Sequence, residues 1–130
     1  MRKRISYLLM LVIVMTAMLG TAANASTESV MWTNISSATV DINKNGASSS
    51  ATGTVVGISG TTNISGTITV YLKSGSTLIY VASNSGSTTT RTLAVDVTFT
   101  AISGATYVAV FSGSVTANGT TESFSVSCTK

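Results

Sequence analysis

The chain has 130 residues, 8% of them charged, with no histidine, no proline and one cysteine. Arg2, Lys3 and Arg4 account for the formal net charge of +3, since removing these three from seven basic residues leaves four against four acidic ones. A neutral remainder gives no support for nucleic-acid binding, which depends on neutralised phosphates, and a chain without histidine has no imidazole base or imidazole metal ligand.

Residues 1–25 have the pattern of a secretory signal peptide. A basic start is followed by an apolar run over residues 5–19 and by the small-x-small sequence Ala23-Asn24-Ala25. The run is shorter than the ~18–20 residues that a membrane span needs. We therefore expect cleavage, secretion and no membrane insertion of the mature chain, with an uncleaved N-terminal anchor as the alternative.

Alternating apolar residues predict strands at residues 36–42, 50–56, 68–72, 78–82, 92–101, 106–115 and 123–128. Serine and threonine make up 41 of residues 26–130, a composition also found in disordered stalks. The strict alternation and the lack of proline favour a folded domain instead. The predicted organisation is a signal peptide (1–25), a lead-in segment (26–35) and a single β domain (36–130).

The stretch DINKNG begins like a calcium-binding loop, with Asp41, Asn43 and Asn45 at ligand positions 1, 3 and 5. Position 12 is Thr52, which cannot supply the two carboxylate oxygens that this position provides. The preferred interpretation is a hairpin that turns at residues 45–46, with Val40 opposite Ala51 and Ile42 opposite Ser49. A weak calcium site is the alternative.

A second turn is predicted at residues 74–75, which places Val70 opposite Ile79. The other face of this hairpin then collects three large side chains, Tyr71, Leu78 and Tyr80. Exposed aromatic groups on so polar a chain are candidates for contact with a protein or a glycan. Ordinary cross-strand pairing on an outer sheet face is the alternative explanation.

A third turn is predicted at Asn118-Gly119, because both residues tolerate the positive φ of a type I′ turn. It pairs Ala117 with Thr120 and brings Phe111 opposite Val126. Both members of the second pair belong to faces that the alternation already marks as apolar. Two independent patterns therefore agree on this register.

Seven short antiparallel strands in about 100 residues predict an all-β fold, a seven-stranded antiparallel immunoglobulin-like β-sandwich. Gly104 shortly before Tyr107 resembles the tyrosine corner of such domains, in which the hydroxyl bonds back to the chain. Together with Trp32 and Thr121-Glu122, this makes the mature chain similar to small secreted immunoglobulin-like β-sandwich proteins of Gram-positive bacteria. The resemblance implies a fold and secretion but no activity, because that group has no characterised function.

Catalysis finds no support in the residue pattern. Ser127 and Lys130 fit the S-x-x-K pattern of serine penicillin-recognising enzymes, but residues three apart on a strand point to opposite faces. Cys128 is expected to be a small, buried apolar side chain, with an intermolecular disulfide as the alternative.

The predicted function is therefore that of a secreted, non-enzymatic binding or surface-interaction module without a cofactor. Its partner is an unidentified protein or glycan, and the contact residues are Tyr71, Leu78 and Tyr80. We expect a monomer. The alternative is a structural subunit that assembles through its edge strands.

Overall fold

The structure, a computed structural model, describes residues 32–130. The predicted signal peptide and residues 26–31 of the lead-in segment lie outside the described residues. Seven strands and one short 3-10 turn follow in order: β1 (Ile35–Asn43), η1 (Gly46–Ser48), β2 (Ser49–Gly57), β3 (Thr61–Ser74), β4 (Thr77–Thr88), β5 (Thr92–Phe99), β6 (Thr106–Ala117) and β7 (Thr120–Thr129). All seven predicted strands are present, and β3 and β4 are longer than the alternation indicated. Within this part of the chain, no helix has the length and apolar character needed to cross a membrane.

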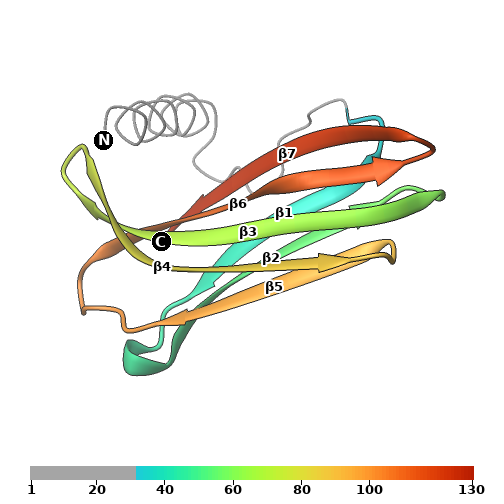
Figure 1. Cartoon of the computed structure of the whole chain (residues 1–130). Helices are drawn as coiled ribbons and strands as arrows, with labels where there is room; N and C mark the ends of the chain where they lie inside the picture. Colours follow the sequence, from blue (N-terminus) through green and yellow to red (C-terminus); the bar gives the residue numbers. More distant parts are fainter. Residues whose placement is uncertain (1–31) are drawn as a thin grey trace.

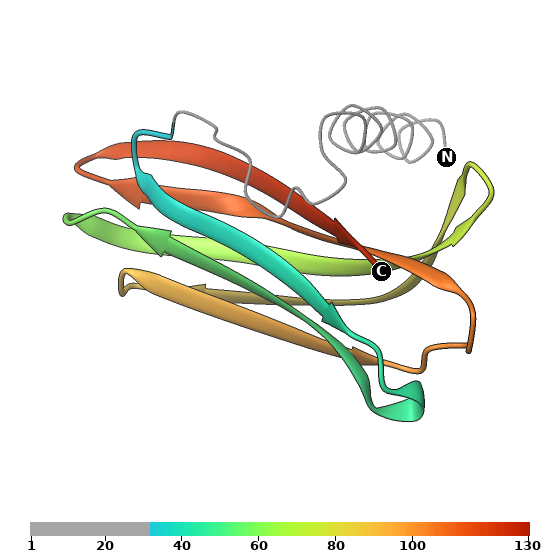
Figure 2. The same ribbon diagram turned by 180° about the vertical axis from the view of Figure 1, so that it is seen from behind.

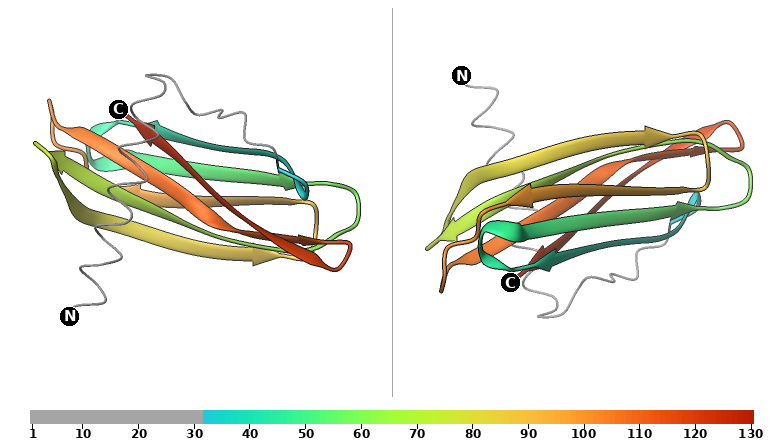
Figure 3. Two further views of the ribbon diagram at one scale, coloured as in Figure 1. Left: turned by 90° about the horizontal axis from the view of Figure 1, so that it is seen from above. Right: turned by 90° about the horizontal axis from the view of Figure 1, so that it is seen from below.

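The strands form two antiparallel sheets with the orders β1-β2-β5 and β4-β3-β6-β7. The sheets pack face to face as two layers, as opposite views of the molecule show (Figures 1 and 2). Views along the other axis show β4 running beside β5 at one open side of the sandwich and β1 beside β7 at the other (Figure 3). The expectation of an all-β fold with two antiparallel sheets is confirmed.

Alternation along each strand sends one set of side chains into the space between the sheets. In β5, Leu93, Val95, Val97 and Phe99 are all buried while the residues between them are exposed. Phe111 of β6 lies at the centre of the core, fully buried, with its ring centroid 5.1 Å from that of Phe124. Both sheets therefore contribute to one apolar core.

The hairpin between β6 and β7 has the predicted register. Ala117 lies opposite Thr120, and Phe111 lies opposite Val126. The turn residues Asn118 and Gly119 have φ values of 52° and 80°, which a type I′ turn requires. The sequence prediction of this hairpin is confirmed.

The register predicted for β1 and β2 is wrong by two residues, because Ile42 pairs with Ala51 rather than with Ser49. The physical reason is a longer loop that the Ser49 side chain holds together. The Asn45 N–H donates to the Ser49 hydroxyl at 2.8 Å, and this hydroxyl donates to the Gly46 carbonyl at 2.7 Å. A shift of two residues keeps every side chain on its predicted face, so the inward face of β1 is as expected.

The register predicted for β3 and β4 is also wrong by two, since Ile79 lies opposite Leu72 rather than Val70. The turn occupies residues 75–76, between Ser74 and Thr77, and Gly75 has a φ of 61°. Glycine therefore fills the first central position of the turn, as in type II′, and not the second. This shift of two residues keeps Leu78 and Tyr80 on their predicted face. Beyond Tyr80 a bulge shifts the pairing by one more residue, so Ile68 lies opposite Asn84.

Polar contacts fix the start of the described chain to the β6–β7 hairpin. The Glu122 carboxylate accepts hydrogen bonds from the N–H groups of Thr33 and Asn34, at 2.8–3.0 Å. The buried Asn34 side chain donates to the Thr120 carbonyl at 2.8 Å.

A further hydrogen bond ties β6 to the loop that precedes it. The hydroxyl of Tyr107, near the start of β6, accepts from the Ile102 N–H of this loop at 2.8 Å, which is the bond expected at this tyrosine.

Candidate functional site

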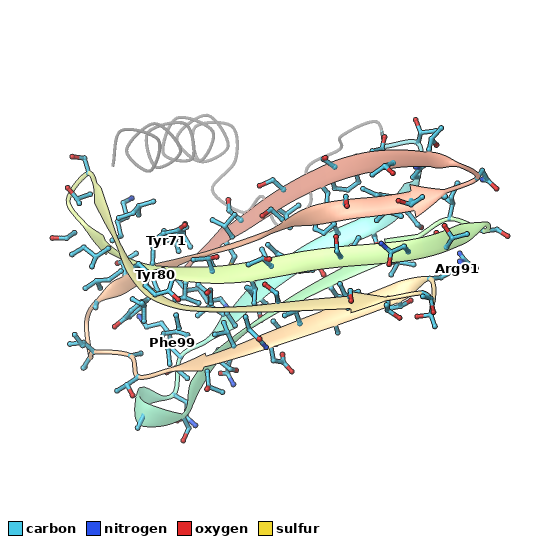
Figure 4. All side chains as sticks on the ribbon, viewed as in Figure 1. Tyr71, Tyr80, Arg91 and Phe99 are labelled. Atoms are coloured by element: carbon cyan, nitrogen blue, oxygen red, sulfur yellow. The ribbon has the colours of Figure 1, made fainter. Side chains whose placement is uncertain are left out.

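The three predicted contact residues share the outer face of the four-stranded sheet. Tyr71 of β3 lies directly opposite Tyr80 of β4, and Leu78 lies two residues before Tyr80 on the same strand face. Figure 4 shows the two tyrosines near the end of the sandwich where the β3–β4 hairpin lies. The structure therefore brings these side chains together, although the register that predicted their meeting was wrong.

Tyr71 is the buried member of this group. It is only 8% exposed and packs in a cluster with Val108 and Val110 of β6, and Leu78 packs against the same cluster. Burial raises the pKa of the Tyr71 phenol, and the nearby Tyr80 adds to the effect. The two valines were not among the predicted contact residues, and the signal for them is that residues 107–111 are apolar on both faces of the strand.

Three large apolar side chains are exposed near this cluster, Tyr80, Ile79 and Ile102. Their exposed fractions are 61%, 48% and 62%, and they are the large apolar side chains that the described residues expose. Only Tyr80 shares the sheet face of Tyr71 and Leu78, because neighbouring residues of a strand point to opposite faces. Ile79 and Tyr80 lie in the β3–β4 hairpin, and Ile102 lies in the loop between β5 and β6. Both segments lie at the same end of the sandwich (Figure 1).

A β-bulge in β4 sets the position of this hairpin. Val70 pairs with Ala82 and Tyr71 pairs with Tyr80, so Val81 is an extra residue on β4. Bulges bend the strand that carries them and change the direction of nearby side chains. The tip of the hairpin projects beyond the other strands (Figures 1 and 2), which leaves Tyr80 open to a partner.

The rest of the same outer face is lined with hydroxyl groups that bond to one another. Ser65 pairs with Ser114 at 3.3 Å, and Thr67 pairs with Ser85 at 2.8 Å. Such cross-strand hydroxyl pairs stabilise a sheet locally. Their mutual bonds leave fewer free donors and acceptors for a ligand, so the apolar cluster is the chemically distinct part of this face.

The candidate calcium ligands lie on the other sheet and beside it. Asp41 and Asn43 are exposed on β1, and Asn45 precedes η1. The Asp41 carboxylate accepts a hydrogen bond from the Lys130 ammonium at 2.9 Å and forms an ion pair with it. Within residues 32–130, no three His, Cys, Asp or Glu side chains are grouped closely enough to hold a metal ion. The one carboxylate of this loop is thus already paired with a cation.

The ion pair predicts a pH dependence of stability. The hydrogen bond from Lys130 holds the pKa of Asp41 below its ordinary 3.8, and Asp41 raises the pKa of Lys130 above 10.5. A carboxyl group whose pKa is lowered by folding stabilises the folded state at pH values above its unfolded-state pKa. This stabilisation is lost as the pH falls through the folded-state pKa. A lysine whose pKa is raised by folding stabilises the folded state below its unfolded-state pKa, and this stabilisation is lost as the pH rises through the folded-state pKa.

Asp41→Asn is therefore expected to lower the melting temperature slightly at neutral pH, because the pair is exposed and exposed pairs contribute little. The difference from the natural chain should disappear as the pH falls through the folded-state pKa of Asp41, which lies below 3.8, because the carboxyl group is then protonated in both states. Thermal melts at neutral and at acidic pH measure this. A difference that stays constant down to the lowest pH would contradict the assignment.

Cys128 faces the core from β7 and is partly buried there, with its thiol free. Burial raises the pKa of this thiol, and a thiol with a raised pKa is a poor nucleophile at neutral pH. Its surroundings therefore favour the packing role expected from the sequence.

These features define the class of the protein as an all-β fold of two packed antiparallel sheets, with three and four strands. Comparisons with family models, with curated proteins and with solved structures found no significant match for the chain.

Proposed function

We propose that the protein is a secreted, non-enzymatic binding module with an immunoglobulin-like fold, and that Tyr80 is the centre of its contact surface. The observation that carries the proposal is the pairing of an exposed Tyr80 with a buried Tyr71 on the outer face of the sheet. The Tyr71 ring is buried in a cluster with Val108 and Val110 and lies directly across from Tyr80. The two strands therefore present adjacent aromatic side chains on one face, a large apolar area for a partner.

Two features support the immunoglobulin-like class. The Tyr107 hydroxyl bonds back to the chain five residues upstream, as in a tyrosine corner. The strand order also fits a variant of that fold. In constant-type domains the fourth strand pairs with the fifth, whereas β4 here pairs with β3. The sheet that contains β3, β6 and β7 corresponds to the one that gains strands in variable-type domains. Secretion is supported by the signal-peptide pattern of residues 1–25.

The absence of an enzymatic role is supported by the partners of the acidic groups. Within the described residues, Asp41 binds Lys130, Asp96 accepts from the Thr52 hydroxyl, and Glu122 accepts from backbone N–H groups. Each carboxylate therefore has a structural contact, and no two of them make a direct hydrogen-bonded pair.

The chemistry of the surface suits a sugar ring or an apolar patch on a protein. A tyrosine offers a large flat face together with a hydroxyl group, and this combination makes the residue common at interfaces. The Tyr80 hydroxyl lies 2.9 Å from the Ser83 hydroxyl, which restricts the ring. The partner is thus a protein or glycan that packs against the ring face.

Tyr80→Ala is expected to weaken binding by about tenfold or more, because removing an aromatic anchor costs more than about 1.4 kcal/mol. Tyr80→Phe keeps the ring and is expected to retain most of the affinity. Ile102→Ala is the matched control for loss of exposed apolar area outside the cluster.

A glycan array and a panel of extracellular proteins, probed with the three variants and the natural chain, measure these effects. Equal binding by Tyr80→Ala and the natural chain would contradict the proposed surface. A loss of binding in Ile102→Ala as large as that in Tyr80→Ala would show that the contact is not centred on Tyr80.

A further inference from the structure

The four edge strands of the two sheets differ in charge. β1 carries Asp41, β5 carries Asp96 and β7 carries Glu122. β4, also an edge strand, has 12 residues without a charged side chain or a proline. Charged residues and prolines on edge strands prevent pairing with other chains, so β4 is the edge without this protection.

Only part of β4 is open to another strand. In its second half, the Asn84 side chain donates to the Asp96 carbonyl of β5 at 2.7 Å, and the two strands run side by side. β5 ends at Phe99, whereas the first residues of β4 lie in the projecting hairpin (Figure 1). Residues 77–80 have β3 on one side and, within the described part of the chain, no strand on the other.

The opposite open side of the sandwich is closed by contacts between side chains and backbone. Lys130 of the C-terminus donates to the Ile42 carbonyl of β1 at 3.0 Å. At the other end of β1, Glu122 of β7 holds the N–H groups of Thr33 and Asn34. These contacts tie both ends of β1 to β7 and the C-terminus, whereas the start of β4 has no such contact to a neighbouring edge strand among the hydrogen bonds of the described residues.

We propose that residues 78–80 of β4 pair antiparallel with the same residues of a second copy of the chain. An uncharged strand is complementary to itself, because a two-fold axis places no like charges opposite each other. With Ile79 at the axis, Leu78 of each copy lies opposite Tyr80 of the other. Aliphatic and aromatic side chains form favourable cross-strand pairs.

This pairing joins two four-stranded sheets into one continuous sheet. A two-fold axis perpendicular to the sheet keeps both outer faces on the same side, so both Tyr71–Tyr80 clusters face the same direction. The interface has only a few residues and is small, and interfaces of this size are weak and reversible. The expected species is a dimer in rapid exchange with the monomer.

Sedimentation velocity of the purified protein, expressed from the full chain, tests the proposal at roughly 10 µM to 1 mM, where weak interfaces associate. The natural chain is expected to shift toward the mass of a dimer as its concentration rises. Ile79→Lys places a charge on the free edge and is expected to remain monomeric. Ile102→Lys makes the same change at a similarly exposed residue outside the strand and should behave like the natural chain.

A natural chain that stays monomeric over the whole range would overturn the proposal, as would an equal loss of association in both lysine variants. Thr77→Lys, at an exposed residue of the same edge, replaces Ile79→Lys if that variant does not fold. The sedimentation experiment contains no binding partner, so its result does not depend on whether Tyr80 binds a ligand. Failure of one of the two experiments therefore does not decide the outcome of the other.

Discussion

Phe111→Ala is expected to lower the free energy of unfolding by about 3–5 kcal/mol, the range found when a large buried aromatic side chain is removed. The ring is fully buried and lies 5.1 Å from the ring of Phe124, centroid to centroid. It fills the space left by two glycines, Gly53 of β2 and Gly66 of β3. Its removal leaves a cavity between the two sheets that a rigid strand framework cannot close.

Urea unfolding followed by tryptophan fluorescence measures this change. Phe111→Leu keeps most of the apolar volume and is expected to cost less than the alanine variant. Domains of this size have about 5–15 kcal/mol of stability in total, so the alanine variant is expected to lose a large part of it. A loss below about 1 kcal/mol would show that the ring is not central to the core.

Gly53→Ala is expected to destabilise the protein by about 1–3 kcal/mol or more through overpacking. A Cβ at this position would lie 2.3 Å from Cγ of Phe111, in the facing sheet. Neither a strand backbone nor a fully buried ring moves easily by the distance needed. Gly86→Ala is the matched control, because its Cβ would meet its nearest atom, on Val95, at 3.2 Å.

The coupling between the two positions tests the cause of the effect. If the clash with the ring is the reason, Gly53→Ala should cost less in a Phe111→Leu background than in the natural chain. Residues in contact show such non-additive changes, whereas distant ones add. Strict additivity of the two substitutions, measured by urea unfolding, would contradict the clash.

The strands and their faces were predictable because alternation is a local property of the sequence. The β6–β7 register was also predictable, since the backbone angles of Asn118 and Gly119 determine it. The other two registers depended on details of the loops. A side-chain hydroxyl of Ser49 holds the β1–β2 loop, and the position of Gly75 within its turn sets the β3–β4 register.

The candidate site was predictable in part for the same reason. A register error of two residues preserves faces, so Tyr71, Leu78 and Tyr80 were correctly placed together. Alternation carries no information about sheet order, however. The packing of Val108 against Tyr71, the exposure of Ile102 and the edge position of β4 all depend on which strands are neighbours.

The most direct test of the proposed contact surface is site-specific photo-crosslinking in extracellular material from the producing cells. A photoreactive aromatic residue replaces Tyr80 in one variant and Thr98, exposed on the outer face of the other sheet, in a second. A discrete adduct from position 80, and none from position 98, is the result that the proposal predicts. Adducts of equal yield from both positions, or none from position 80, would contradict it.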